Sequence, residues 1–213
     1  MIPIYQISQD NSLEFLLLSL LFLLIGFLRA YYWKYTKLLI SASFKYRYAS
    51  QYLKQDNVFT ERVNWLTFII LLINISLLFL YQEASLNISS FFIVAGCVLL
   101  YYTLKFLIIM FLGKLMFIKE ITRLTIVFSY LSDKSLALVI SPLILILYFF
   151  PFDITMILII IIFLIGVVFF ASKLFWIWRI GTNSFGLSPI YLFLYLCILE
   201  IYPFVLITKG FFY

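Results

Sequence analysis

Residues 154–175 read ITMILIIIIFLIGVVFFASKLF, and Lys173 is the one charged residue among them. An α-helix needs about 20 predominantly apolar residues to cross the hydrocarbon core of a bilayer, so this stretch predicts a transmembrane helix. Runs of similar character recur along the chain, at residues 13–32, 63–81, 88–112, 136–150 and 189–208. Because the run at 136–150 is short, its helix is expected to start earlier, around residues 129–135, with Asp133 and Lys134 near the headgroups. The sequence therefore predicts an all-α, polytopic membrane bundle of about six transmembrane helices, forming a single integral membrane domain over residues 1–213.

The composition agrees with a membrane protein. Of the 213 residues, 66% are hydrophobic and only 11% are charged, which leaves too little polar surface to cover a water-soluble globule. No basic segment precedes the first apolar run and no small-residue cleavage site follows it. We therefore expect that run to be a retained anchor and not a signal peptide.

The basic residues predict an orientation. All 15 lysines and arginines except Lys105 and Lys209 lie in or beside the gaps that follow the first, third and fifth apolar runs. Cytoplasmic loops of membrane proteins are enriched in Lys and Arg. Both termini should then face away from the cytoplasm, with anionic lipid headgroups as the partners of the basic side. Nucleic acid is not expected as a partner, because no recognition module accompanies the basic residues.

Residues 33–62, on the basic side, show helical periodicity. The apolar positions of this segment are Tyr35, Leu38, Leu39, Ala42, Tyr46, Ala49, Tyr52 and Leu53, and the opposite side carries Thr36, Ser43, Arg47, Ser50 and Lys54. The pattern predicts a cytoplasmic amphipathic helix at the membrane surface, whose contacts with lipid or a partner come from Tyr35, Leu38, Leu39, Lys45, Arg47, Tyr52 and Leu53. Such a helix either stabilises the bundle or docks a partner protein. Residues 116–131 are predicted to lie at the surface in the same way or to extend a neighbouring helix.

Several functional classes lack their usual residues. The chain has no histidine, and its two cysteines, Cys97 and Cys197, fall inside predicted helices with no metal-binding spacing. No glycine-rich phosphate loop and no nucleophile motif is present. We therefore expect no metal and no cofactor, and the sequence leans against an enzyme without excluding one.

Three polar residues at membrane depth are candidate functional residues: Asn74, Lys105 and Glu200. A charged side chain at this depth is costly unless it is paired or reaches the headgroups. Three alternatives follow: Lys105 extends to the inner headgroups, Lys105 and Glu200 form a structural pair that Asn74 joins, or these residues line a path for a substrate or proton.

Two prolines lie inside predicted helices, Pro142 and Pro203. Proline lacks a backbone donor and bends a helix, so each site exposes polar backbone groups that a neighbour or water must satisfy. These bends either fill the bundle or, at Pro203, border a small polar cavity around Glu200.

The stretch YLFLYLCILEIYPF, residues 191–204, carries a family resemblance together with the basic segment 29–54. It resembles an uncharacterised family of six-helix inner-membrane proteins from Bacteroidota, a domain of unknown function often encoded beside uroporphyrinogen-III synthase and a polyprenyl-mannose synthase. The spacing of Cys197, Glu200 and Pro203 is the most specific part of the likeness. The resemblance implies a cell-envelope location and no mechanism.

Two function classes remain. The sequence favours a non-catalytic subunit of a larger inner-membrane assembly for envelope biogenesis or protein export, with other membrane proteins as partners. The alternative is a small carrier or a membrane-embedded lipid-handling enzyme with Lys105 and Glu200 at its site, because three helices followed by three of opposite orientation resemble the inverted halves of transporters.

Overall fold

The computed structural model describes residues 12–44, 48, 52, 58–81, 88–115, 119–149 and 155–185. The elements in these ranges are helices: α1 (Ser12–Tyr31), α2 (Trp33–Phe44), α4 (Val58–Leu80), α5 (Ile88–Leu115), α6 (Lys119–Phe149) and α7 (Thr155–Phe185). Among the described residues there is no strand, and five helices are long and apolar enough to cross a membrane. The predicted all-α membrane fold is thus confirmed. The sixth predicted span, residues 189–208, lies outside the described residues.

The helix boundaries differ most from the sequence prediction in α6. The predicted run began at residue 136, whereas α6 is one continuous helix of 31 residues whose apolar span begins at Ile126. The span includes Asp133 and Lys134, which the sequence had placed near the headgroups. The segment 116–131, whose character the sequence left open, is represented by the first turns of α6 from Lys119 onward.

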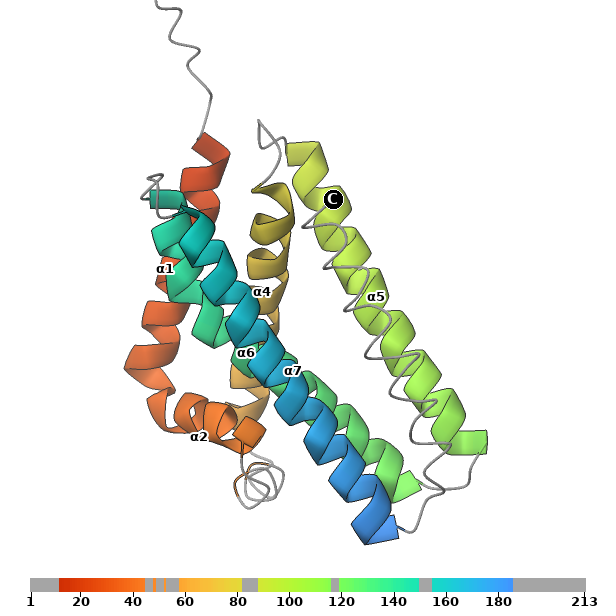
Figure 1. Ribbon diagram of the computed structural model, residues 1–213. Coiled ribbons are helices and arrows are strands. Elements are labelled where there is room, and N and C mark those ends of the chain that lie inside the picture. The colour runs from red at the N-terminus through yellow and green to blue at the C-terminus, as the bar shows by residue number, and fades with distance from the viewer. Residues whose placement is uncertain are drawn as a thin grey trace, which may run out of the picture.

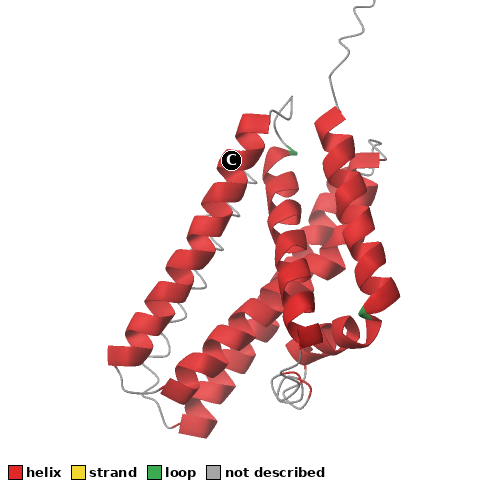
Figure 2. Ribbon diagram, turned by 180° about the vertical axis from the view of Figure 1, so that it is seen from behind, coloured by secondary structure: helices red, strands yellow, loops and turns green. Residues whose placement is uncertain are grey.

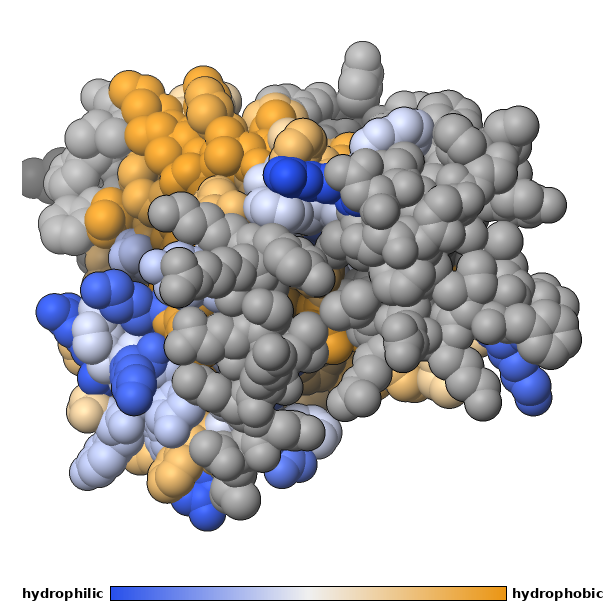
Figure 3. All heavy atoms as spheres, turned by 90° about the horizontal axis from the view of Figure 1, so that it is seen from below, coloured by the Kyte–Doolittle hydropathy of each residue, from blue (hydrophilic) through white to orange (hydrophobic). Residues whose placement is uncertain are grey.

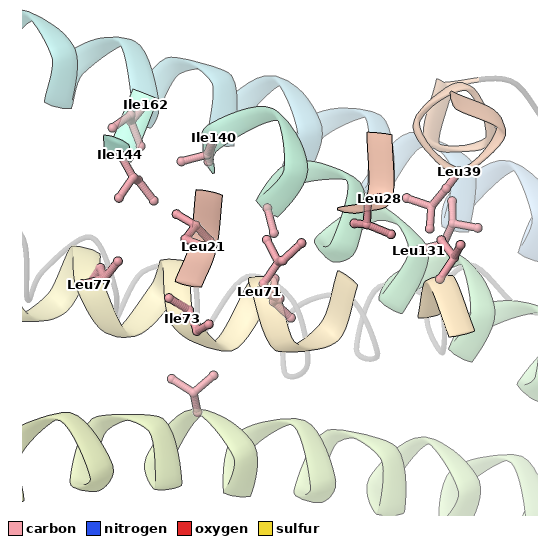
Figure 4. Packing of buried hydrophobic residues seen from close by; sticks show 14 of the residues in the cluster. Leu21, Leu28, Leu39, Leu71, Ile73, Leu77, Leu131, Ile140, Ile144 and Ile162 are labelled. Atoms are coloured by element: carbon pink, nitrogen blue, oxygen red, sulfur yellow. The ribbon is translucent and has the colours of Figure 1, made fainter. Parts of the chain in front are cut away.

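Two helices form the interior of the described bundle. Half of the α4 span is buried, compared with 17% of the α7 span, and α6 packs extensively against both α4 and α7. Figure 4 shows Leu21 of α1, Leu77 of α4 and Ile144 of α6 among the side chains of the core, and all three are fully buried. In lipid, such packing replaces the hydrophobic drive between helices, so α4 and α6 provide the frame to which the other helices attach.

The short helix α2 turns sideways at the end of α1, after Tyr32 (Figures 1 and 2). It packs on α6, and a hydrogen bond joins the hydroxyls of Ser43 and Ser135. Thr36, Leu39, Ala42 and Ser43 are its buried residues. Thr36 and Ser43, predicted on the outward polar side, therefore lie against the bundle, and Leu39, expected to contact lipid or a partner, is 0% exposed.

The helix ends that flank the basic gaps meet at one end of the bundle (Figure 1). The last turns of α1, α5 and α7 and the first turns of α4 and α6 lie at this end. Figure 3 looks at this end, where hydrophilic residues gather beside an apolar flank. We call it the basic end.

Candidate functional site

The centre of the candidate site is the carboxylate of Asp133 on α6. Its Oδ1 lies 2.8 Å from the ammonium nitrogen Nζ of Lys173 on α7, and its Oδ2 lies 3.6 Å from Nζ of Lys105 on α5. The side chains of Lys105 and Lys173 are 1% and 5% exposed. Three separate helices thus bring their charges to one point inside the bundle. We call these three residues the Asp133 cluster.

The members of the Asp133 cluster lie at one depth. Lys105 and Lys173 each precede the basic end of their spans, at Phe111 and Arg179, by six residues, and Asp133 follows Ile126 by seven. At 1.5 Å per residue these positions are about 9 to 10 Å inside the membrane from the basic end. Charges at this depth are costly unless they are paired, which explains why the three residues meet.

Two tyrosines, Tyr102 of α5 and Tyr130 of α6, support the Asp133 cluster. The Tyr102 hydroxyl donates a hydrogen bond to Oδ2 of Asp133 at 3.4 Å, and the Tyr130 hydroxyl donates to the Tyr102 carbonyl at 2.6 Å. The Tyr102 ring contacts those of Phe68 and Tyr130, with ring centroids 5.8 Å and 5.6 Å away. The aromatic contacts fix the ring, so the hydroxyl of Tyr102 is directed at the carboxylate.

Asn74 on α4 bonds to the neighbouring turn of α6. Its Nδ2 donates to the Ala137 carbonyl at 2.8 Å and to the Ser141 hydroxyl at 2.9 Å. Ala137 and Ser141 lie in the turn just before Pro142, so the amide of Asn74 joins α4 to α6 beside the proline. The other polar atom of Asn74, Oδ1, is buried and has no hydrogen-bond partner among the residues that the structure describes. This oxygen accepts a bond from any donor that enters.

A cavity of about 210 Å³ adjoins both groups. Its polar lining includes Asn74, Asp133 and Lys173, and its walls are mostly apolar side chains of α4, α6 and α7. Gly166 of α7 also lines the cavity, and no heavy atom lies within 4 Å of the position that a Cβ would take there. The cavity therefore has an asparagine, an aspartate and a lysine in its lining that could contact a small molecule.

A second polar group lies nearer the basic end. The Tyr52 hydroxyl donates to Oδ1 of Asn64 at 2.9 Å, and Nζ of Lys134 donates to the same oxygen at 3.3 Å. Burial raises the pKa of the Tyr52 hydroxyl above its ordinary value, so this hydroxyl stays protonated and donates at neutral pH. These residues line a separate cleft, and Tyr102 borders both spaces.

The predicted site residues differ in their burial and in their contacts, and some of them lie outside the described residues. Lys105 and Asn74 are each 2% exposed. Lys105 does not extend to the headgroups but pairs with Asp133, and Asn74 bonds to α6. Glu200 and Pro203 lie outside the described residues, as do Lys45, Arg47 and Leu53, so the pairing of Glu200 with Lys105 stays a prediction. Of the predicted lipid or partner contacts, Tyr35 and Leu38 are half-buried and Tyr52 is buried.

Sequence reasoning missed Asp133 and Lys173 as site residues. The sequence prediction placed Asp133 near the headgroups and counted Lys173 among the basic residues beside the gap after the fifth run. One signal was available: each residue has apolar residues within one helical turn on both sides, as Lys105 does. Among the described residues, no group of histidine, cysteine, aspartate or glutamate side chains fits a metal ion, and Cys97 is exposed.

The comparison with family models decides the affiliation. The model of a domain of unknown function, DUF4271, matches residues 15–211, nearly the whole chain. The chain belongs to this family. The predicted membership of a family of unknown function is confirmed, and the bacterial group and gene neighbourhood implied by the resemblance stay predictions. Neither curated proteins nor solved structures gave a match to this DUF4271 protein.

Proposed function

We propose that this multi-pass DUF4271 protein is a small carrier of the bacterial inner membrane that binds a polar ligand inside its bundle. The observation that carries the proposal is the Asp133 cluster, in which α5, α6 and α7 each place a charge at one depth beside a cavity. Ionisable residues inside membrane helices are rare and commonly mark substrate or proton pathways. Purely structural contacts do not need them, because apolar packing stabilises a bundle at lower cost.

The lining of the cavity indicates the chemistry of the ligand. Oδ1 of Asn74 is a buried acceptor without a donor in the described part of the chain, which favours a ligand that carries a hydroxyl or amine. Lys173 and Asp133 offer a charged pair on the same cavity. A lipid headgroup carries such groups too, so lipid handling would use the same site.

The test of this function is a substitution that fills the cavity. Gly166→Leu places a side chain in open space on the cavity wall, and leucine favours a helix more than glycine does. We expect the variant to insert and melt like the wild type, yet to lose the uptake of hydroxyl- or amine-bearing solutes that the proposal expects of wild-type proteoliposomes. The matched control is Gly96→Leu, at an exposed glycine of α5 with equally open space that does not line the cavity. Uptake by Gly166→Leu equal to that by the wild type and by Gly96→Leu would overturn the carrier proposal.

A second candidate is the non-catalytic subunit of a larger envelope assembly. The observation that favours it is the outer surface of α1, α5 and α7, whose spans are at most 22% buried and therefore present long apolar faces. Partner proteins or lipid would cover these faces. A subunit copurifies with stoichiometric partners in mild detergent, and a carrier does not.

The orientation that we propose places the basic end in the cytoplasm and both termini outside. In a variant without Cys97 and Cys197, a cysteine at positions 82–87 should react with a membrane-impermeant maleimide from outside. A cysteine in place of Lys37, exposed on α2 at the basic end, should react only after permeabilisation. The reverse pattern would invert every assignment of sides.

A further inference from the structure

A cleft of about 690 Å³ lies between α4, α5 and α6 toward the basic end. This volume is in the range of pockets that bind small organic molecules. We call it the α5 cleft. The polar residues of its described lining are Tyr52, Thr60, Asn64, Tyr102, Thr103, Tyr130 and Lys134. It is distinct from the 210 Å³ cavity and faces a different side of α6.

The described lining of the α5 cleft carries positive charge only. Lys134 is the only charged residue among the described residues that line it, and no carboxylate does so. Asp133 precedes Lys134 by one residue, but its oxygens bond to Lys105, Lys173 and Tyr102 in the Asp133 cluster. The bond to Asn64 uses one of the three donors of the Lys134 ammonium group. The cleft therefore favours an anion at Lys134.

The rest of the α5 cleft is apolar and includes lipid-facing residues. Phe106 and Leu107 of α5 line it and are among the exposed hydrophobic residues of the span, while Phe68 and Leu131 line it from α4 and α6. Thr60 and Asn64 lie in the first two turns of α4, at the basic end. A ligand here contacts a cation and hydroxyls on one side and aliphatic and aromatic side chains on the other. These two surfaces match the anionic headgroup and the acyl chains of a phospholipid.

We propose that the α5 cleft binds one anionic phospholipid, with its phosphate group at Lys134 and an acyl chain along Phe106 and Leu107. Charge complementarity selects this occupant, because the single cation has no acidic residue beside it in the described lining. The basic end would place the site in the leaflet whose anionic headgroups attract basic residues. The proposal does not depend on the carrier function, since the two spaces are separate.

Native mass spectrometry of the full-length, delipidated protein tests this site. On titration with phosphatidylglycerol we expect one lipid to bind more tightly than phosphatidylcholine does. Lys134→Gln should weaken phosphatidylglycerol binding about fivefold, the effect of one basic residue near an anionic headgroup. Leu107→Trp, which fills the apolar part of the α5 cleft without changing the charge, should weaken both lipids. The matched control is Lys37→Gln, which removes an exposed lysine of α2 away from the cleft and should change neither.

Several results would overturn the proposal. One is equal binding of the two lipids together with no effect of Lys134→Gln in a variant that melts like the wild type. Another is displacement of phosphatidylglycerol by millimolar inorganic phosphate, which would make this a site for free anions. The third test places a photoreactive residue at position 107, which we expect to crosslink to lipid. Crosslinking to residues 186–213 would overturn the proposal, because the occupant of the cleft would then be a segment of the chain itself.

Discussion

Asp133→Leu is expected to destabilise the bundle by about 3 to 5 kcal/mol, the usual cost of removing one partner of a buried ion pair. The substitution takes the carboxylate from two ammonium groups whose side chains are 1% and 5% exposed. It also removes the acceptor of the Tyr102 hydroxyl. For a protein of this length the loss corresponds to a melting temperature lower by roughly 10 °C. Thermal unfolding in detergent, followed by size-exclusion chromatography, measures it.

Two further variants identify the cause of that loss. Asp133→Asn keeps an acceptor for Tyr102 and removes the charge, so its melting temperature should fall between those of the wild type and Asp133→Leu. Lys134→Met changes the next residue of the same helix, which bonds to Asn64, and should cost far less. If Asp133→Leu melted like the wild type, the two lysines would not depend on Asp133 and the candidate site would lose its centre.

The membrane spans could be predicted from the sequence because hydrophobic length alone defines them. The exception is α6, whose span contains a run of polar residues around Asp133 and Lys134 that makes it the least apolar of the five. The apolar run begins only at residue 136 for this reason, although the helix was expected to start around residues 129–135. The structure accommodates these residues by turning Asp133 toward two lysines and Lys134 toward Asn64.

The candidate site could be predicted only in part. Lys105 was recognisable because apolar residues surround it in the sequence. Its partner could not be predicted, since pairing depends on how α5, α6 and α7 are rotated about their axes, and no spacing within one helix encodes that. The role of Lys173 could not be predicted either. It lies near the end of a long apolar run, where a lysine side chain ordinarily reaches the headgroups.

The inward face of α2 shows a second limit of periodicity. Thr36 and Ser43 were assigned to the polar side, yet both are buried. The Thr36 hydroxyl donates to the Tyr32 carbonyl at 3.0 Å, and the Ser43 hydroxyl bonds to Ser135 of α6. A small hydroxyl that is satisfied by its own helix or its neighbour allows close approach of two helices. Hydrophobicity alone therefore misplaced this face.

Leu39→Glu is expected to disrupt the bundle, with a loss of at least about 3 kcal/mol. Removing a buried leucine alone typically costs about 2 to 5 kcal/mol, and the new carboxyl group would have to be buried as well. Leu39 is fully buried in the hydrophobic core. We expect the purified variant to aggregate or to melt well below the wild type, as measured by fluorescence-detected size-exclusion chromatography.

The neighbouring substitution Leu38→Glu separates folding from partner binding. Leu38 is half-buried at the edge of the core, so its carboxyl group can turn outward and the bundle should remain folded. In the subunit alternative, this folded variant would lose a protein that copurifies with the wild type, because the partner would meet a charge on α2. Retention of every copurifying protein by Leu38→Glu would exclude this part of α2 as the docking surface. If Leu39→Glu melted like Leu38→Glu, α2 would not pack on α6 in the membrane, and the face defined by Thr36, Leu39 and Ser43 would have to be assigned to lipid or a partner after all.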